Sequence, residues 1–124
     1  RGPSAELDEP VLAGMAAAVR PGGVVIVSAF SAYFQLGSTD ETNATVESFD
    51  AALGVNREKT SVRDAEGQEL PVTLWTTCYT PRELRLLARA VGLTPVAVYG
   101  VTPGRYGPNP PTTDCPEFLL VAAP

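Results

Sequence analysis

The chain has 124 residues, which suits one domain but is short for a complete doubly wound α/β enzyme. Apolar residues make up 44% of it and aromatic residues 7%, so the core must be mainly aliphatic. The formal net charge is −5 and no Lys/Arg-rich run occurs, which argues against nucleic acid as a partner because an acidic surface repels phosphate backbones. No apolar stretch approaches the roughly 20 residues of a membrane span, and the polar N-terminus does not resemble a signal peptide. We therefore expect a cytoplasmic protein with no membrane partner.

Histidine is absent from the sequence, which removes His-based triads, His-containing zinc sites and imidazole bases from consideration. The two cysteines, Cys78 and Cys115, lie far apart and form no CxxC pair. In a cytosolic chain this pattern predicts two free thiols and no metal site.

The first elements are a helix and a strand joined by a tight turn. An apolar stripe that includes Val11, Leu12 and Met15 predicts a helix over residues 9–20, which the Pro-Gly-Gly sequence then ends. A strand follows from Gly23 to about Phe30. Its continuous Val-Val-Ile-Val run is typical of a strand covered on both faces, as in a parallel sheet.

The middle of the chain is harder to interpret. Residues 31–58 have no clear period, although apolar spacing predicts a short helix near 42–53. Residues 60–63 and 70–79 alternate in polarity around a turn at 64–67, and this pattern predicts a hairpin.

The C-terminal part has the strongest local signals. Thr80 and Glu83 form a capping box that begins a second helix, and Gly92 is a suitable residue to end it. Two further strands are predicted over 94–101 and 117–123. A proline-rich loop joins them.

Three segments, taken in this order, resemble the C-terminal half of a class I S-adenosylmethionine-dependent methyltransferase domain. They are the RPGG turn at 20–23 before a buried strand, the YTPRELRLLARAVGL helix at 79–93, and the closing PEFLLVA strand at 116–122. The resemblance covers nearly all of residues 1–124, which we interpret as the C-terminal part of one such domain, cut from a longer chain.

The resemblance implies an α/β fold in which the complete domain has a Rossmann-like sheet of seven strands. This chain would hold strands 5, 6 and 7 with two helices, and residues 31–79 would be a loop and hairpin insertion. In the family the seventh strand is antiparallel and lies between the other two.

The same resemblance implies S-adenosylmethionine as the cofactor. The family binds it mainly through a Gly-rich turn after the first strand and an acidic residue after the second, and neither segment occurs here. We therefore assign no cofactor-binding or catalytic residue to this chain, and we expect it to be inactive by itself.

A substrate pocket is expected where two long loops meet. Ligands of open α/β sheets bind outside the carboxyl ends of the parallel strands, and the loops 31–58 and 102–116 would leave the sheet at that edge. The aromatic side chains at this edge can line a pocket or close the core, and Tyr106 can simply lie on the surface of its loop. The carboxylates of Asp114 and Glu117 can contact substrate or form a polar rim. The candidate substrate-binding residues are Phe30, Tyr33, Phe34, Tyr106, Asp114 and Glu117.

Two functions remain open at this point. The first is methyl transfer to a small-molecule acceptor, in which alignment supplies much of the acceleration because a sulfonium methyl is already activated. The second is a non-catalytic, methyltransferase-like interaction domain or subunit. The exposed edge of the 23–30 strand would then pair with the missing N-terminal half or with another copy. An α/β-hydrolase is excluded because both histidine and a G-x-S-x-G elbow are absent.

Overall fold

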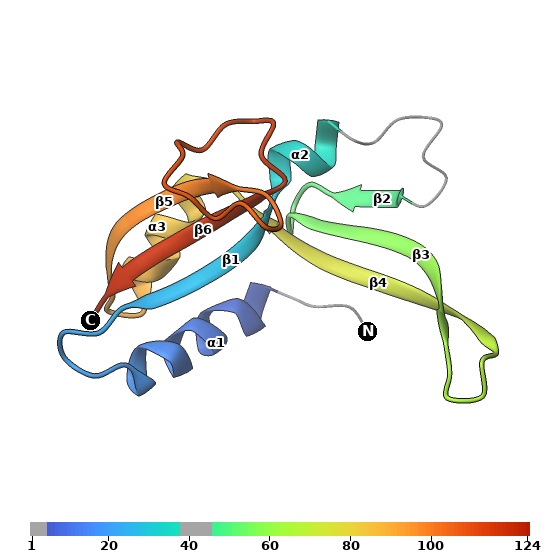
Figure 1. Cartoon of the computed structure of the whole chain (residues 1–124), viewed down its shortest axis with the longest axis horizontal. Helices are drawn as coiled ribbons and strands as arrows, with labels where there is room; N and C mark the ends of the chain where they lie inside the picture. The colour runs from blue at the N-terminus through green and yellow to red at the C-terminus, as the bar shows by residue number, and fades with distance from the viewer. Residues whose placement is uncertain (1–4, 38–45) are drawn as a thin grey trace.

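A computed structural model describes residues 5–37 and 46–124 of the chain (Figure 1). Within these ranges the strands form a sheet in the order β2-β3-β4-β1-β6-β5. The elements in chain order are α1 (Ala5–Ala18), β1 (Val25–Ser31), α2 (Ala32–Gly37), β2 (Val46–Asp50), β3 (Val55–Arg63), β4 (Glu69–Tyr79), α3 (Pro81–Ala90), β5 (Thr94–Val101) and β6 (Glu117–Ala123). None of the described helices combines the length and the apolar character needed to cross a bilayer.

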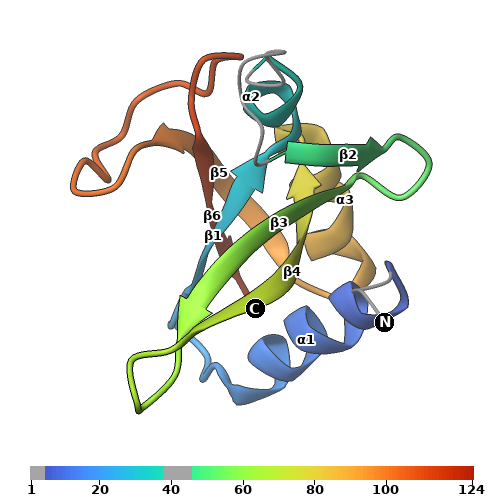
Figure 2. The ribbon, with the colours of Figure 1, turned by 90° about the vertical axis from the view of Figure 1, so that its right-hand side faces the viewer.

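The last strand, β6, lies between β1 and β5 and is antiparallel to both (Figures 1 and 2). Consequently β1 and β5 run parallel to each other, although they do not touch. This arrangement confirms the predicted order, in which the final strand inserts between two parallel ones. The predicted bounds of β5 and β6 agree with the structure, and β1 is shifted by one or two residues.

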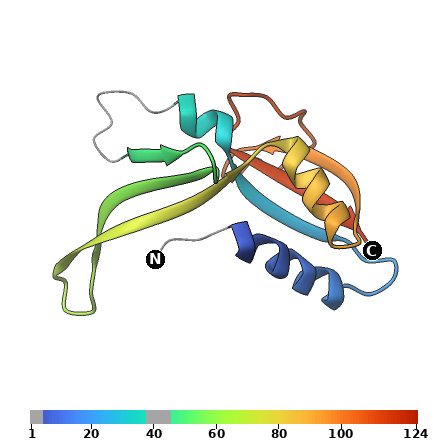
Figure 3. The same ribbon diagram turned by 180° about the vertical axis from the view of Figure 1, so that it is seen from behind.

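Helices α1 and α3 cover one face of the β1-β6-β5 half-sheet (Figure 3). The core lies between these helices and the half-sheet. It consists of every second residue of the strands together with the inner residues of the helices. Its buried members are Leu12, Val25, Leu84, Ala88, Leu93, Val98, Phe118, Leu120 and Ala122. On the opposite face of β1, Ile26 and Phe30 are 58% and 46% exposed, and no described helix covers them.

Helix α1 packs less completely than its apolar stripe predicts. Leu12 is buried, whereas Val11 and Met15 are 60% and 41% exposed. These two apolar side chains border an open hollow beside β1 instead of a closed core.

Helix α3 has regular caps at both ends, as predicted. The Thr80 Oγ1 accepts from the Glu83 N–H at 3.2 Å, and the Glu83 Oε1 accepts from the Thr80 N–H at 2.9 Å. At the other end Gly92 has φ +84°, and the Leu93 N–H donates to the Ala88 carbonyl at 2.9 Å. This is a Schellman motif, which satisfies carbonyls that the helix end would leave free.

The predicted hairpin is present and longer than its sequence signal. Strands β3 and β4 pair from Val55–Thr77 to Arg63–Glu69, and the Asp64 Oδ1 accepts two backbone N–H groups in the turn. The hairpin extends away from the half-sheet (Figure 1). It joins the half-sheet through two parallel residue pairs, Phe30–Cys78 and Ser31–Tyr79.

The helix predicted near 42–53 is wrong where the structure can be compared. Residues 46–50 form strand β2, and the Asp50 Oδ1 accepts from the backbone N–H groups of Ala52 and Leu53. The chain then reverses at Gly54, so that β2 pairs with β3 instead of continuing as a helix. Residues 42–45 of that prediction lie outside the described residues. Helix α2, which was not predicted, follows β1 directly.

The proline-rich loop depends on a close approach at Gly100. The Gly100 N–H donates to the Asn109 carbonyl at 2.9 Å. A Cβ at this position would collide with the Cys115 Sγ and lie 2.9 Å from the Pro110 carbonyl oxygen.

We therefore predict that Gly100→Ala displaces the loop and lowers the free energy of unfolding by about 1–3 kcal/mol, the usual cost of overpacking. Chemical denaturation measures this change. Gly107→Ala is the matched control, because the nearest atom there would be 3.7 Å away. Equal effects of the two substitutions would contradict the proposed role of the close approach.

Candidate functional site at the carboxyl edge of the sheet

Three strands end at the same edge of the sheet (Figure 2). Ser31, the last residue of β1, pairs with Tyr79 at the end of β4, and its N–H donates to the Pro116 carbonyl at 3.0 Å. Val101, the last residue of β5, pairs with Glu117 of β6. Helix α2, the start of α3 and the loop after β5 therefore surround one edge, where open α/β sheets bind ligands.

Three of the predicted substrate-binding residues lie together at this edge. Tyr33, Phe34 and Asp114 line one hollow of about 240 Å³, which Thr113 also borders. The Tyr33 ring packs edge-on against Phe118, with centroids 6.4 Å apart and planes at 79°. This packing fixes α2 on the end of the core strand.

The other three predicted residues are placed differently. Phe30 and Glu117 are cross-strand neighbours in the β1–β6 pair, and Phe30 lies on the face that no described helix covers. Tyr106 follows a tight turn closed by hydrogen bonds between Thr102 and Arg105, and its side chain is 54% exposed. A role in substrate binding stays a prediction for all six residues.

A second hollow at the same edge involves residues that the sequence analysis did not select. Arg82 and Arg85 of α3 face Thr112 and Thr113 of the loop, and Tyr33 borders both hollows. The two arginines lie three residues apart, one inside the capping box and the other two residues after it; this spacing marks one side of the helix but not the loop that faces it. The buried Asn56 was also missed; its Nδ2 donates to the Gln35 Oε1 at 3.3 Å.

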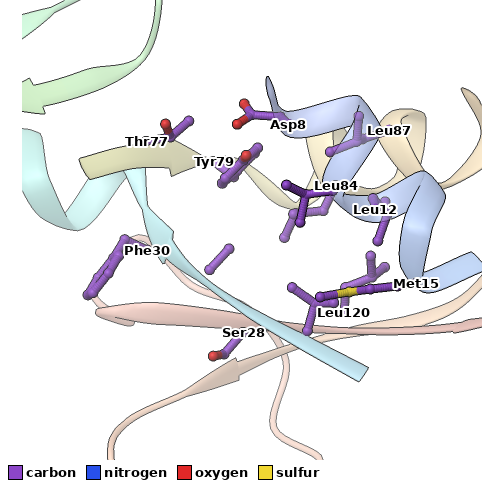
Figure 4. A pocket seen from close by; sticks show the side chains of 13 residues that line it. Asp8, Leu12, Met15, Ser28, Phe30, Thr77, Tyr79, Leu84, Leu87 and Leu120 are labelled. Carbon is purple, nitrogen blue, oxygen red and sulfur yellow. The ribbon is translucent and has the colours of Figure 1, made fainter. Parts of the chain in front are cut away.

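A third, mainly apolar hollow of about 240 Å³ lies beside the open edge of β1 (Figure 4). Residues 25–29 of β1 have no strand partner on this side among the described residues. Leu12 and Met15 of α1 line the hollow from one side and Tyr79 and Leu84 from another. Tyr79 and Asp8 both line this hollow. Burial first, and then hydrogen bonding to the Asp8 carboxylate, raise the pKa of Tyr79.

Both cysteines are free thiols, as predicted. Cys78 is buried at the point where β4 meets β1. Burial is the largest cause that raises the pKa of its thiol to about 11; a hydrogen bond with the Asn56 backbone acts in the opposite direction.

No protein-family model matches the chain, and no curated protein matches it either. Among solved structures, the chain is similar to the CcbJ methyltransferase of Streptomyces caelestis, with a TM-score of 0.69 and 17% identity. It is also similar to an S-adenosylmethionine-dependent methyltransferase of Clostridium acetobutylicum, with a TM-score of 0.63 and 14% identity.

This chain has the fold of the C-terminal half of a class I methyltransferase. Each alignment covers 93% of the chain and only 49% or 50% of the neighbour's own length. The chain thus spans about half of the structures that it matches.

The described residues do not fit S-adenosylmethionine by themselves. The glycines with positive φ at 22, 54, 67, 92 and 104 lie in turns and at a helix end. None of them follows a strand and opens a helix, which is the arrangement that leaves backbone N–H groups free to hold a cofactor in Rossmann-like folds. We assign no cofactor contact to this half.

The raised pKa of Cys78 predicts a loss of stability in alkaline solution. A thiol that titrates near 9 when unfolded and near 11 when folded contributes fully below pH 9. Between pH 9 and 11 the folded state keeps the proton that the unfolded state has lost, so the free energy of unfolding falls, at most by about 1.4 kcal/mol per pH unit.

Denaturation between pH 8.5 and about 9.5 measures this slope, because Tyr79 adds to it mainly once the pH approaches the ordinary tyrosine pKa of about 10. Cys78→Ala should flatten it relative to the unsubstituted chain. An unchanged slope in the Cys78 variant would refute the assignment.

Proposed function

We propose that this chain is the substrate-side half of an S-adenosylmethionine-dependent methyltransferase that acts on a small molecule. The observation that carries this proposal is the hollowed carboxyl edge of a half-sheet in which β6 is antiparallel between β1 and β5. The similarity of the fold to two methyltransferase structures supports it. We further propose a cytosolic location, which fits the two free thiols.

The open edge of β1 supports the existence of a complementing half. The apolar side chains of Val11 and Met15 are exposed beside the hollow that this edge borders. In our proposal the N-terminal half of the same domain adds a strand along residues 25–29 and covers these side chains. The chain alone is then inactive, because the other half holds the cofactor.

The residues described here would act by positioning the acceptor. S-adenosylmethionine, when bound to the complete domain, supplies an activated methyl group, so alignment of the acceptor atom is the main requirement. Tyr33 and Phe34 provide an apolar wall of the first hollow at the carboxyl edge, and Asp114 provides a carboxylate at its border. This carboxylate can orient an acceptor hydroxyl or amine, or accept its proton.

The first test is calorimetric titration of S-adenosylhomocysteine. We expect no heat of binding with residues 1–124 and micromolar affinity with the longer polypeptide to which we propose the chain belongs. Micromolar binding to residues 1–124 would contradict the division of roles. Absence of binding to the longer polypeptide would contradict the proposed activity.

A second test concerns the face of α1 that, in this proposal, the N-terminal half of the domain covers. Val11→Lys should lower the free energy of unfolding of the longer polypeptide by at least about 2 kcal/mol, because it would bury an unpaired charge under the added strand. Val62→Lys is the matched control: it changes another exposed valine, at 47% exposure on β3, and should cost less than about 0.5 kcal/mol. Similar small effects of both substitutions would show that nothing covers α1.

The alternative is a non-catalytic, methyltransferase-like subunit. The observation that favours it is the same open β1 edge, because an unpaired edge can pair with another copy as readily as with a strand of its own domain. Sedimentation analysis separates the two functions. A stable homodimer of the longer polypeptide that binds no S-adenosylhomocysteine supports the alternative, whereas a monomer that binds it supports the enzyme.

A further inference from the structure

The second hollow at the carboxyl edge is lined by an unusual set of hydrogen-bond donors. We name it the arginine cradle and define it by Tyr33, Arg82, Arg85, Thr112 and Thr113. It has a volume of about 370 Å³, and Phe118 and Pro111 form apolar parts of its wall. Its residues come from α2, from α3 and from the loop after β5, so the fold brings three distant segments together there.

Helix α3 sets the orientation of the two arginines. The capping box fixes where the helix begins, and residues three apart lie on the same side of a helix. Leu84 and Ala88 are buried in the core, which turns the arginine side outward to the loop. Arg85 is half-buried, whereas Arg82 is exposed. The backbone of this first turn contributes few donors, because Pro81 has no N–H and the Glu83 N–H is bonded to Thr80.

The charges around the cradle are unbalanced. Within residues 5–37 and 46–124, neither guanidinium forms an ion pair. Glu83, the acidic residue of the same helix turn, uses its Oε1 to accept from the Thr80 N–H at 2.9 Å. Asp114 lines the neighbouring hollow and not the cradle. The two arginine side chains line the cradle, and with Arg89 they also border a hollow further along α3, in a chain whose net charge is −5.

The hydroxyl groups extend this set of donors. Tyr33 and Thr113, which each carry a hydroxyl, line both hollows. The Thr112 Oγ1 accepts from the Asp114 N–H at 3.3 Å and lies 3.2 Å from the Cys115 Sγ. When the thiol donates to this oxygen, the Thr112 hydroxyl proton is free for a ligand.

We propose that the arginine cradle binds an anionic oxygen group, a carboxylate or a phosphate, of the small-molecule acceptor. A planar guanidinium can donate two parallel hydrogen bonds to such a group, and hydroxyls complete its coordination. The apolar wall beside the cradle suits the body of the same molecule. This inference rests on the proposed function and adds to it a chemical class of substrate, a small organic acid or phosphate ester.

The test is an NMR titration of the isotope-labelled longer polypeptide with inorganic phosphate and, separately, with acetate. We expect saturable shifts of the Arg82 and Arg85 Nε–H signals and of the Thr112 and Thr113 amides with at least one probe, at concentrations up to tens of millimolar. The probe with the higher affinity distinguishes a phosphate-bearing from a carboxylate-bearing acceptor.

Arg85→Gln should weaken this binding by at least about tenfold, the loss expected for one charge-assisted bidentate pair. Arg89→Gln is the matched control. Arg89 lies one turn further along α3 and does not line the cradle, so its removal should change the affinity by less than about twofold. Equal losses in both variants would show general attraction to the helix and would overturn the site, as would shifts that do not saturate.

Titration of the same variants with S-adenosylhomocysteine separates this inference from the proposed function. Unchanged cofactor affinity with lost anion binding supports the cradle. Normal cofactor affinity without any anion binding overturns the cradle and leaves the methyltransferase proposal intact. If the longer polypeptide binds anions but no cofactor, the proposed function fails and the cradle remains an anion site of a non-catalytic protein.

Discussion

The pairing of β6 on both of its sides is the interaction on which the rest of the structure depends. Phe118, Leu120 and Ala122 have no exposed surface, and they belong to the same buried cluster as Leu12 of α1 and Leu84 and Ala88 of α3. Because β6 runs antiparallel to its two neighbours, β1 and β5 point the same way and release their following segments at one edge. The candidate site exists because this strand joins elements that are distant in sequence.

The sequence predicted the elements whose signals are local. The capping box at Thr80 and the turn after Pro21 mark their ends by hydrogen bonding and backbone geometry that depend on a few adjacent residues. The buried strands could be predicted because β-branched runs between turn residues have few alternatives in a chain of this size. The half-sheet was correct for these reasons together with the family resemblance.

The errors arose where tertiary pairing decides the structure. The apolar residues between 42 and 53 have a helical spacing, yet the turn that Asp50 stabilises directs residues 46–50 into pairing with β3. Likewise, the apolar stripe of α1 predicts burial of Val11, which is largely exposed here. The hollow between α3 and the loop after β5 was not predictable, because no local pattern brings Arg85 close to Thr112.

The attachment of the β3–β4 hairpin has a consequence for motion. Two residue pairs join it to the half-sheet. Beyond these pairs, β3 and β4 are held by pairing with each other and by the pairing of β2 with β3. Side-chain contacts add to this, such as that of Arg57, whose Cζ lies 5.4 Å from the centroid of the Trp75 ring. Such a ribbon can open from its tip without disturbing the core, because little apolar surface is exposed when it does so. Amide hydrogen exchange should therefore slow progressively from Arg63 toward Cys78, and the hairpin would behave as a separate cooperative unit hinged where β4 meets β1.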